Sequence, residues 1–149
     1  MPDQLPSQSL AARLLTSPLP DDRGGRLMLL ALRRMGAHGL NDAAIVHHFV
    51  NGFGVRFRRP LLLTRLVVQQ LSECAGSAIQ IAPGCCPRMT AAESAIIGAA
   101  ASALHAPEKA RLLIADLLDS RHPDACLAAI SAMAGAYFDA ALPIGGWRR

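Results

Sequence analysis

Helical periodicity is the sequence feature that most constrains how this chain folds. Six segments repeat apolar residues every three or four positions, and glycine, proline or helix-capping residues separate them. We expect helices over about 23–37, 42–51, 60–74, 90–104, 107–118 and 123–141. The sequence therefore predicts an all-α fold, a compact bundle of about six helices with no substantial sheet. Alternating up-and-down packing is the simplest architecture for such a bundle.

Several helix boundaries follow from individual residues. Gly39 can end the first helix, and Asn41 can cap the second. Thr90 and Glu93 have the spacing of a capping box at the start of the fourth helix. Prolines suit the first turn of three other helices, those at Pro60, Pro107 and Pro123. Residues 77–82 are the only candidate for an extended segment, and one strand makes no sheet.

The length of 149 residues suits one domain with flanking tails. Residues 1–21 are rich in Pro, Ser, Gln and Asp and predict a flexible N-terminal tail. Residues 22–142 then form a single helical domain, and 143–149 form a loose C-terminal tail. No secretory signal and no membrane span is expected, which favours a cytoplasmic protein with free thiols.

The composition is apolar for a soluble monomer. Mean hydropathy is +0.28, and much of the apolar excess is alanine. Small residues are frequent in the segments 90–104 and 123–141, where they would allow helices to approach closely. We therefore expect an apolar surface patch and a homodimer.

The middle of the chain is strongly basic. Between Arg23 and Arg65 there are eight arginines and one acidic residue, Asp42, whereas the whole chain carries only +4. Arginine binds carboxylate and phosphate groups in a planar fork. This favours a small non-enzymatic binding or regulatory protein that uses an arginine-rich surface to bind an acidic protein surface or a small anion. A solvated arginine face, or a genome that favours arginine codons, explains the same charges.

The candidate binding residues are expected to cluster where the helices at 23–37, 60–74 and 90–104 approach one another. They are Arg33, Arg34, His38, Arg58, Arg59 and Arg88.

A second hypothesis rests on the adjacent pair Cys85 and Cys86, just ahead of the helix that starts near Thr90. A helix N-terminus and a neighbouring guanidinium, here that of Arg88, both stabilise a thiolate. The chain could then be a thiol-dependent enzyme or a metal-binding protein. The alternative is that both cysteines are small packed side chains. No Cys-x-x-Cys or His-x-x-x-His pair is present, so the metal stays unknown and no cofactor is expected.

Other functions have less support. No hydrolase, Walker or Rossmann motif occurs, which leans against an enzyme. The segments 23–37 and 42–51 have roughly helix-turn-helix spacing, but the second contains no Arg or Lys to contact DNA. Non-specific nucleic-acid binding through phosphate attraction is a third, weaker alternative.

Three blocks of sequence, 33–43, 57–61 and 81–90, are distinctive in combination. The chain resembles an uncharacterised family of short alphaproteobacterial proteins, a domain of unknown function. The resemblance spans about residues 25–142. It implies a bacterial protein without an assigned activity and supplies no mechanism.

Overall fold

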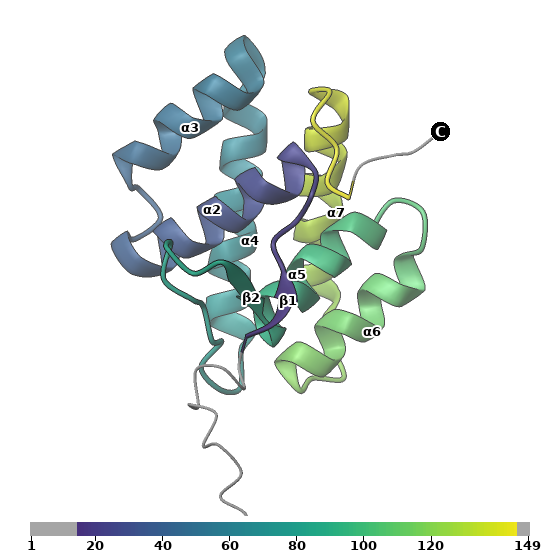
Figure 1. The fold of residues 1–149 in the computed structure, drawn as a ribbon. Helices are drawn as coiled ribbons and strands as arrows, with labels where there is room; N and C mark the ends of the chain where they lie inside the picture. The colour runs from purple at the N-terminus through teal and green to yellow at the C-terminus, as the bar shows by residue number, and fades with distance from the viewer. Residues whose placement is uncertain (1–14, 146–149) are drawn as a thin grey trace, which may run out of the picture.

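Six α-helices make up most of the described chain (Figure 1). The structure is a computed structural model that describes residues 15–145, with residues 15 and 16 described by their backbone alone. A short 3₁₀ turn, η1 (Gly54–Arg56), joins the second of these helices to the third. The helices are α2 (Arg23–His38), α3 (Ala43–Phe53), α4 (Arg58–Cys74), α5 (Ala91–Ser102), α6 (Pro107–Leu118) and α7 (Asp124–Asp139). The all-α prediction is confirmed, and the helix ends differ from the expected ones by at most two residues.

The capping residues act largely as the sequence indicates. The Thr90 hydroxyl accepts the Glu93 N–H over 3.0 Å, and Glu93 in turn accepts the Thr90 N–H. This is the expected capping box at the start of α5. The predicted Asn41 cap is wrong, because Asp42 occupies the N-cap position of α3 and makes no capping hydrogen bond. Its carboxylate binds an arginine of α2 instead.

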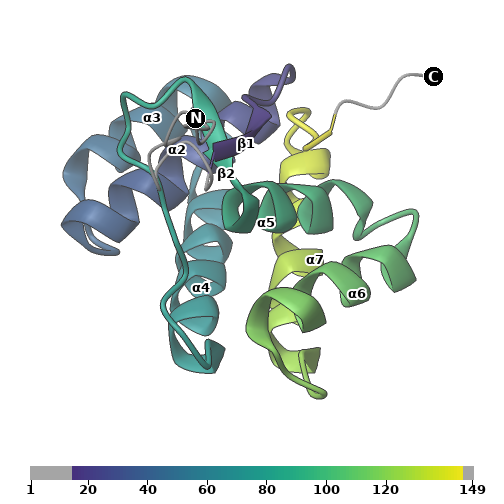
Figure 2. The same cartoon turned by 60° about the horizontal axis from the view of Figure 1, so that its bottom comes forward.

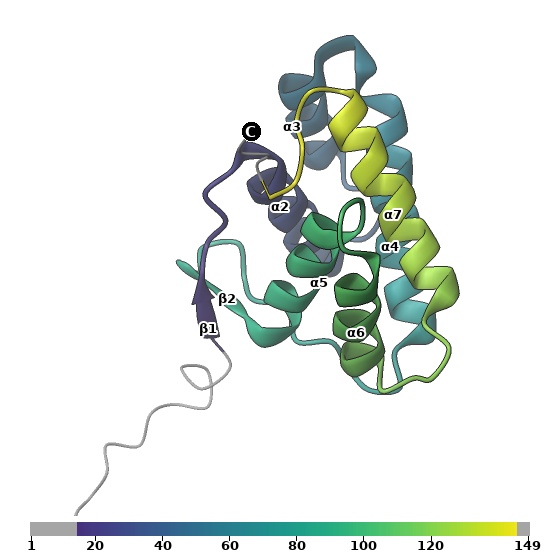
Figure 3. The same cartoon turned by 90° about the vertical axis from the view of Figure 1, so that its right-hand side faces the viewer.

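The packing order differs from a simple up-and-down bundle. The most extensive contact joins α4 to α7, which lie side by side in Figure 3, and the next joins α5 to α6. Tyr137 of α7 is fully buried, and its hydroxyl lies 3.0 Å from the Thr64 hydroxyl of α4. The rings of Phe49 and Phe53 from α3 meet the Tyr137 ring edge to face. Aromatic contacts thus bring α3 onto the α4–α7 pair.

A small antiparallel sheet joins β1 (Leu15–Pro18) to β2 (Arg88–Thr90). Residues 15–18 fall within the expected N-terminal tail, and residues 1–14 of that tail lie outside the described residues. The extended candidate at 77–82 is no strand. Side chains of Thr90 and Glu93 bind its backbone where a neighbouring strand would have done so.

The small residues of α5 and α7 are used inside the protein. Ala99 and Ala100 of α5 and Ala134 and Ala136 of α7 are all buried in the single chain. The homodimer therefore stays a prediction that these faces do not support. At the C-terminal end Ile144 is buried, and residues 146–149 of the expected tail lie outside the described part. Within residues 15–145, every helix is too short or too polar to span a membrane.

Candidate functional site

A buried ion pair lies at the centre of the region that the sequence singles out. Arg33 of α2 and Glu93 in the first turn of α5 are exposed by only 5% and 0%. The Arg33 Nε and Nη2 atoms donate to the two Glu93 carboxylate oxygens, each over 3.0 Å. This bidentate geometry is the strongest form of arginine–carboxylate contact. The pair therefore fastens α2 to the start of α5.

The same pair also holds the chain that leads into β2. Glu93 accepts the backbone N–H of Ala82 over 2.9 Å, in addition to that of Thr90. Arg33 donates to the carbonyl oxygens of Cys86 and Arg88 over 2.9 and 2.8 Å. Four hydrogen bonds of the guanidinium are thus made inside the protein. This geometry gives Arg33 a structural role and does not support the expectation that it binds an external anion.

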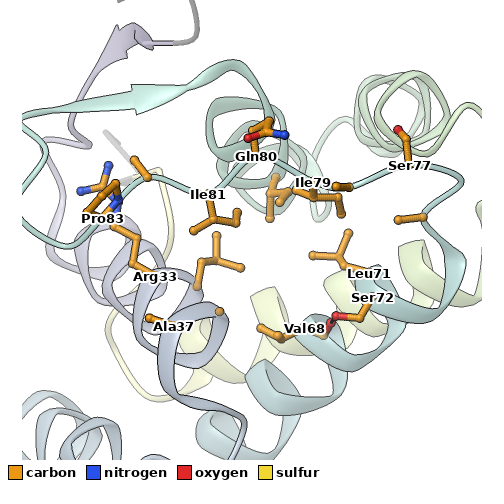
Figure 4. A pocket seen from close by; sticks show the side chains of 16 residues that line it. Arg33, Ala37, Val68, Leu71, Ser72, Ser77, Ile79, Gln80, Ile81 and Pro83 are labelled. Atoms are coloured by element: carbon orange, nitrogen blue, oxygen red, sulfur yellow. Dashed lines mark hydrogen bonds between the residues drawn. The ribbon is translucent and has the colours of Figure 1, made fainter. Parts of the chain in front are cut away.

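An open groove of about 800 Å³ lies beside this ion pair. One wall is α2 and the other is α4, and the segment 75–83, here named the strap, runs across them (Figure 4). Ile79 and Ile81 point from the strap into the space above Val68 and Leu71. The volume lies within the range of pockets that bind small molecules. Small residues of both helices, among them Gly36 and Ala37, leave this space open.

The groove has the chemistry of a binding site. Its aliphatic lining comprises Leu32, Val68, Leu71, Ile79, Ile81 and Ile96. Among its lining residues Arg33 is the only charged one, and Glu93 already neutralises it. No carboxylate, imidazole or thiol in the described chain lines the groove. It can therefore accept apolar groups, but it offers no residue for acid–base catalysis.

Arg34 and His38 lie toward the C-terminal end of α2. Arg34 Nε donates to the Asp42 carboxylate over 2.5 Å, and Nη2 adds a second contact of 3.3 Å. This hydrogen bond, together with the arginine charge, holds the pKa of Asp42 below its usual value. His38 is exposed in the last turn of α2. Arg34 is thus already paired with a carboxylate, whereas His38 faces solvent.

Cys85 and Cys86 lie in a tight turn ahead of β2. The Cys86 N–H donates to the Pro83 carbonyl over 3.0 Å, and Cys85 is exposed while Cys86 is half-buried. Arg88, also exposed, follows at the start of β2. In residues 15–145 no group of three or more His, Cys, Asp or Glu side chains is placed to hold a metal ion. The turn therefore presents one accessible thiol on a backbone that Arg33 holds in place.

Arg58 and Arg59 lie at the opposite end of α4 from the groove. Arg59 pairs with Asp139 of α7 over 3.6 Å, and both side chains are mostly exposed. The groove begins at Val68, ten residues further on, or about 15 Å along the helix at 1.5 Å per residue. The structure therefore does not bring the six predicted binding residues together. Arg58 and Arg59 lie together at the start of α4, and Arg33, Arg34, His38 and Arg88 lie elsewhere.

No short sequence motif indicates the groove. Its walls come from α2, α4 and the strap, and no short motif connects these segments. The available signal was the alternation of Ile79 and Ile81 with polar or small residues, which marks an extended chain with one apolar face.

The cysteines are expected to differ sharply in reactivity. Burial, with a smaller contribution from Cys74, raises the pKa of the Cys126 thiol from 9.0 to about 11. At pH 8 only about 0.1% of this thiol is ionised. Iodoacetamide at pH 8 should therefore modify the exposed Cys85 within minutes and leave Cys126 unmodified until the protein unfolds. Mass spectrometry of the digested protein measures both, and equal labelling rates would contradict the buried position of Cys126.

Comparisons with known proteins give a family but no activity. Neither the curated proteins nor the solved structures gave a match. A family model matches residues 7–149, which is most of the chain, in agreement with the resemblance to a domain of unknown function. That model is described only as a family of unknown function and assigns no role to any residue of the groove or to Arg58 and Arg59. The chain thus belongs to DUF6628, a family of unknown function.

Proposed function

We propose that this protein is a non-enzymatic binding protein that recognises an acidic surface of a partner protein. The contact would be made by the arginine corner, defined as Val55, Arg56, Arg58 and Arg59, where η1 meets α4. The observation that supports this proposal is the exposure of three arginines within four positions, beside a valine that is 96% exposed. Arginine combines charge with a planar hydrogen-bonding fork, and it is enriched in protein interfaces.

The start of α4 is an unfavourable place for this much positive charge. The N-terminus of a helix carries a partial positive charge, so arginines there are unfavourable. The first turn of α4 contains no acidic residue, and no side chain caps it. Among the described residues Asp139 is the carboxylate in contact with the corner: it pairs with Arg59, and its backbone carbonyl accepts from Arg56. One carboxylate against three guanidinium groups leaves the corner positive.

Apolar side chains next to the corner favour a protein partner over a simple anion. Leu62 is 61% exposed and follows Arg58 by four positions, which places both on the same face of α4. Val55, next to Arg56 in η1, adds further exposed apolar surface. A surface of this kind offers both charge attraction and apolar area that a partner can cover.

The competing hypotheses assign binding to different residues or to different ligands. A thiol-dependent enzyme or metal protein would need Cys85 and Cys86 and would be indifferent to the arginine corner. Non-specific nucleic-acid binding would use the same arginines but would prefer phosphate to carboxylate polymers. These differences allow one set of variants to separate the three.

We expect fluorescein-labelled decaglutamate to bind the protein in 50 mM NaCl and to be released in 300 mM NaCl, because salt screens exposed charges. The double variant Arg58→Ala/Arg59→Ala should bind about tenfold more weakly, a loss typical of two interfacial charges. Fluorescence anisotropy measures the affinity. The control Lys109→Ala/Arg121→Ala removes the same net charge from two exposed positions on and after α6, and it should bind as the natural protein does.

Three outcomes would contradict the proposal. The first is an equal loss in both double variants, which would show that only net charge matters. The second is tighter binding of a 24-base-pair DNA duplex or of anionic lipid vesicles than of decaglutamate. The third is loss of binding in Cys85→Ser/Cys86→Ser, which would favour the thiol hypothesis instead.

A further inference from the structure

The backbone of the strap carries a row of free hydrogen-bonding groups. Within the described residues, no hydrogen-bond acceptor lies within reach of the backbone N–H groups of residues 76–81. The next N–H, that of Ala82, donates to Glu93, and the Gln80 carbonyl accepts from the Thr90 hydroxyl over 2.7 Å. Figure 2 shows the chain leaving α4 and running back along that helix in an extended path. The strap therefore resembles a strand that lacks a neighbouring strand.

Within the described part of the chain, one edge of the strap is bound and the other is free. In an extended chain the N–H and C=O groups of alternate residues point to the same edge. The bonds made by Gln80 and Ala82 therefore assign their edge to the side of the α5 N-terminus. The N–H and C=O groups of Ile79 and Ile81 then belong to the opposite, outer edge. Unpaired outer edges of this kind are the surfaces to which other strands add.

The groove lies under the same segment. The Ile79 and Ile81 side chains point down into it, whereas Gln80 points away and is exposed. When a strand pairs with the outer edge, its side chains point to the same face as those of the strap residues directly opposite them. Every second side chain of that strand would thus point toward the mouth of the groove, whose lining is aliphatic.

We propose that the outer edge of residues 77–82 is a docking site for an extended segment of a partner protein, which adds as a strand and places apolar side chains at every second position over the groove. The backbone groups of Ile79 and Ile81 would supply the hydrogen bonds, and the groove would select the side chains. This segment should be uncharged, since Arg33 is the only charged residue of the lining and Glu93 neutralises it.

The structure favours a foreign segment over a second copy of this chain. In a second copy, Ile79 and Ile81 would already point into the groove of that copy. Two straps paired edge to edge would therefore leave both grooves unfilled. A helix as the occupant would leave the edge groups unpaired, because its own backbone groups are bonded internally. This proposal concerns a surface separate from the arginine corner, so either can hold without the other.

The first test uses backbone hydrogen exchange. In the free protein the amides of residues 76–81 should exchange without protection, because no acceptor holds them. The probe is a capped hexapeptide of alternating valine and threonine, and a second capped peptide alternates leucine and serine. At least one should bind saturably below millimolar concentration and slow exchange at Ile79 and Ile81 about tenfold or more, with less effect at Gln80. A binding peptide should no longer bind when every second backbone nitrogen, on the edge that faces the strap, carries a methyl group.

Variants of the strap separate the backbone from the side chain. Ile79→Pro removes an outer N–H and obstructs an added strand, so peptide affinity should fall at least tenfold. Ile79→Ala removes the side chain but keeps the N–H, so it should lose less peptide affinity than Ile79→Pro does. Gln80→Pro removes an N–H of the bound edge and should bind the peptide within about twofold of the natural protein. Circular dichroism and melting temperature confirm that all three variants are folded.

Several results would overturn this inference. One is failure of both peptides to bind at 1 mM. Another is an N-methylated peptide that binds as tightly as the unmethylated one. A third is an equal loss of peptide affinity in Ile79→Pro and Gln80→Pro. Protection of Ile79 and Ile81 that appears with rising protein concentration and no peptide would show that a second copy occupies the edge. The Arg58→Ala/Arg59→Ala variant should bind the peptide normally, and a loss there would mean that the peptide docks at the arginine corner.

Discussion

Replacing Arg33 with methionine should lower the free energy of unfolding by about 3–5 kcal/mol, the cost of removing one partner from a buried ion pair. The variant leaves the Glu93 carboxylate at 0% exposure without its counter-charge. It also removes the two hydrogen bonds that Arg33 donates to the carbonyl groups of Cys86 and Arg88. Urea denaturation followed by circular dichroism measures the loss. The melting temperature should fall by about 10 °C, as expected for a domain of this size.

Two further variants show whether the buried charge is the cause. Arg34→Met breaks the ion pair with Asp42 that is partly exposed, and it should cost far less. The double variant Arg33→Met/Glu93→Leu removes both charges and should recover part of the stability lost by Arg33→Met alone. A double variant that is less stable than Arg33→Met would instead show that the Glu93 bonds to Ala82 and Thr90 dominate. Equal losses in Arg33→Met and Arg34→Met would contradict the burial argument.

Replacing Tyr137 with alanine should lower the free energy of unfolding by about 3–5 kcal/mol, as for other large aromatic residues in a core. This side chain is fully buried and is one of the largest in the core. Its removal opens a cavity where α3, α4 and α7 meet, and the rings of Phe49 and Phe53 lose their edge-to-face partner. Chemical denaturation gives the loss, and the hydrogen exchange of α3 should increase with it.

The hydroxyl group of Tyr137 should account for a small part of that effect. Tyr137→Phe removes the contact with Thr64, whose hydroxyl keeps its 2.7 Å bond to the Pro60 carbonyl. We expect a loss of about 1 kcal/mol for this single hydrogen bond. The surface control Leu112→Ala, at a position that is 71% exposed, should change stability by less than about 0.5 kcal/mol. Losses of similar size in Tyr137→Phe and Tyr137→Ala would show that the hydroxyl, not the ring, is decisive.

The helices were predictable because their signals are local. Apolar spacing, the capping box at Thr90 and Glu93, and Pro107 at the start of α6 each act within one or two turns. The failed Asn41 cap is instructive by contrast. Asp42 takes the N-cap position of α3 instead, but its carboxylate binds Arg34, eight positions away across the α2–α3 turn, and makes no capping hydrogen bond. A local pattern cannot predict a contact that depends on how two helices meet.

Among the candidate binding residues, too, local features were predictable and contacts between distant segments were not. Arg58 and Arg59 are exposed at the start of α4, as charged side chains usually are, so the sequence could nominate them. The basic stretch gave no sign that Arg33 is buried, because its partner Glu93 is 60 positions away. Charge alone does not distinguish a buried, ion-paired arginine such as Arg33 from exposed ones such as Arg58 and Arg59.

The sequence by itself determined the number of helices, their ends, and the basic character of residues 23–65, since these depend on neighbours within a few positions. Only the tertiary structure decided that α4 packs on α7, that Glu93 neutralises Arg33, and that the strap crosses an open groove. The sequence pattern indicated that residues 77–82 are extended, but it did not indicate that no strand of the described chain pairs with them. Whether a strand finds a neighbour is decided by elements far away in the chain. Here Thr90 and Glu93 bind one edge of the strap, and no group of residues 15–145 binds its other edge.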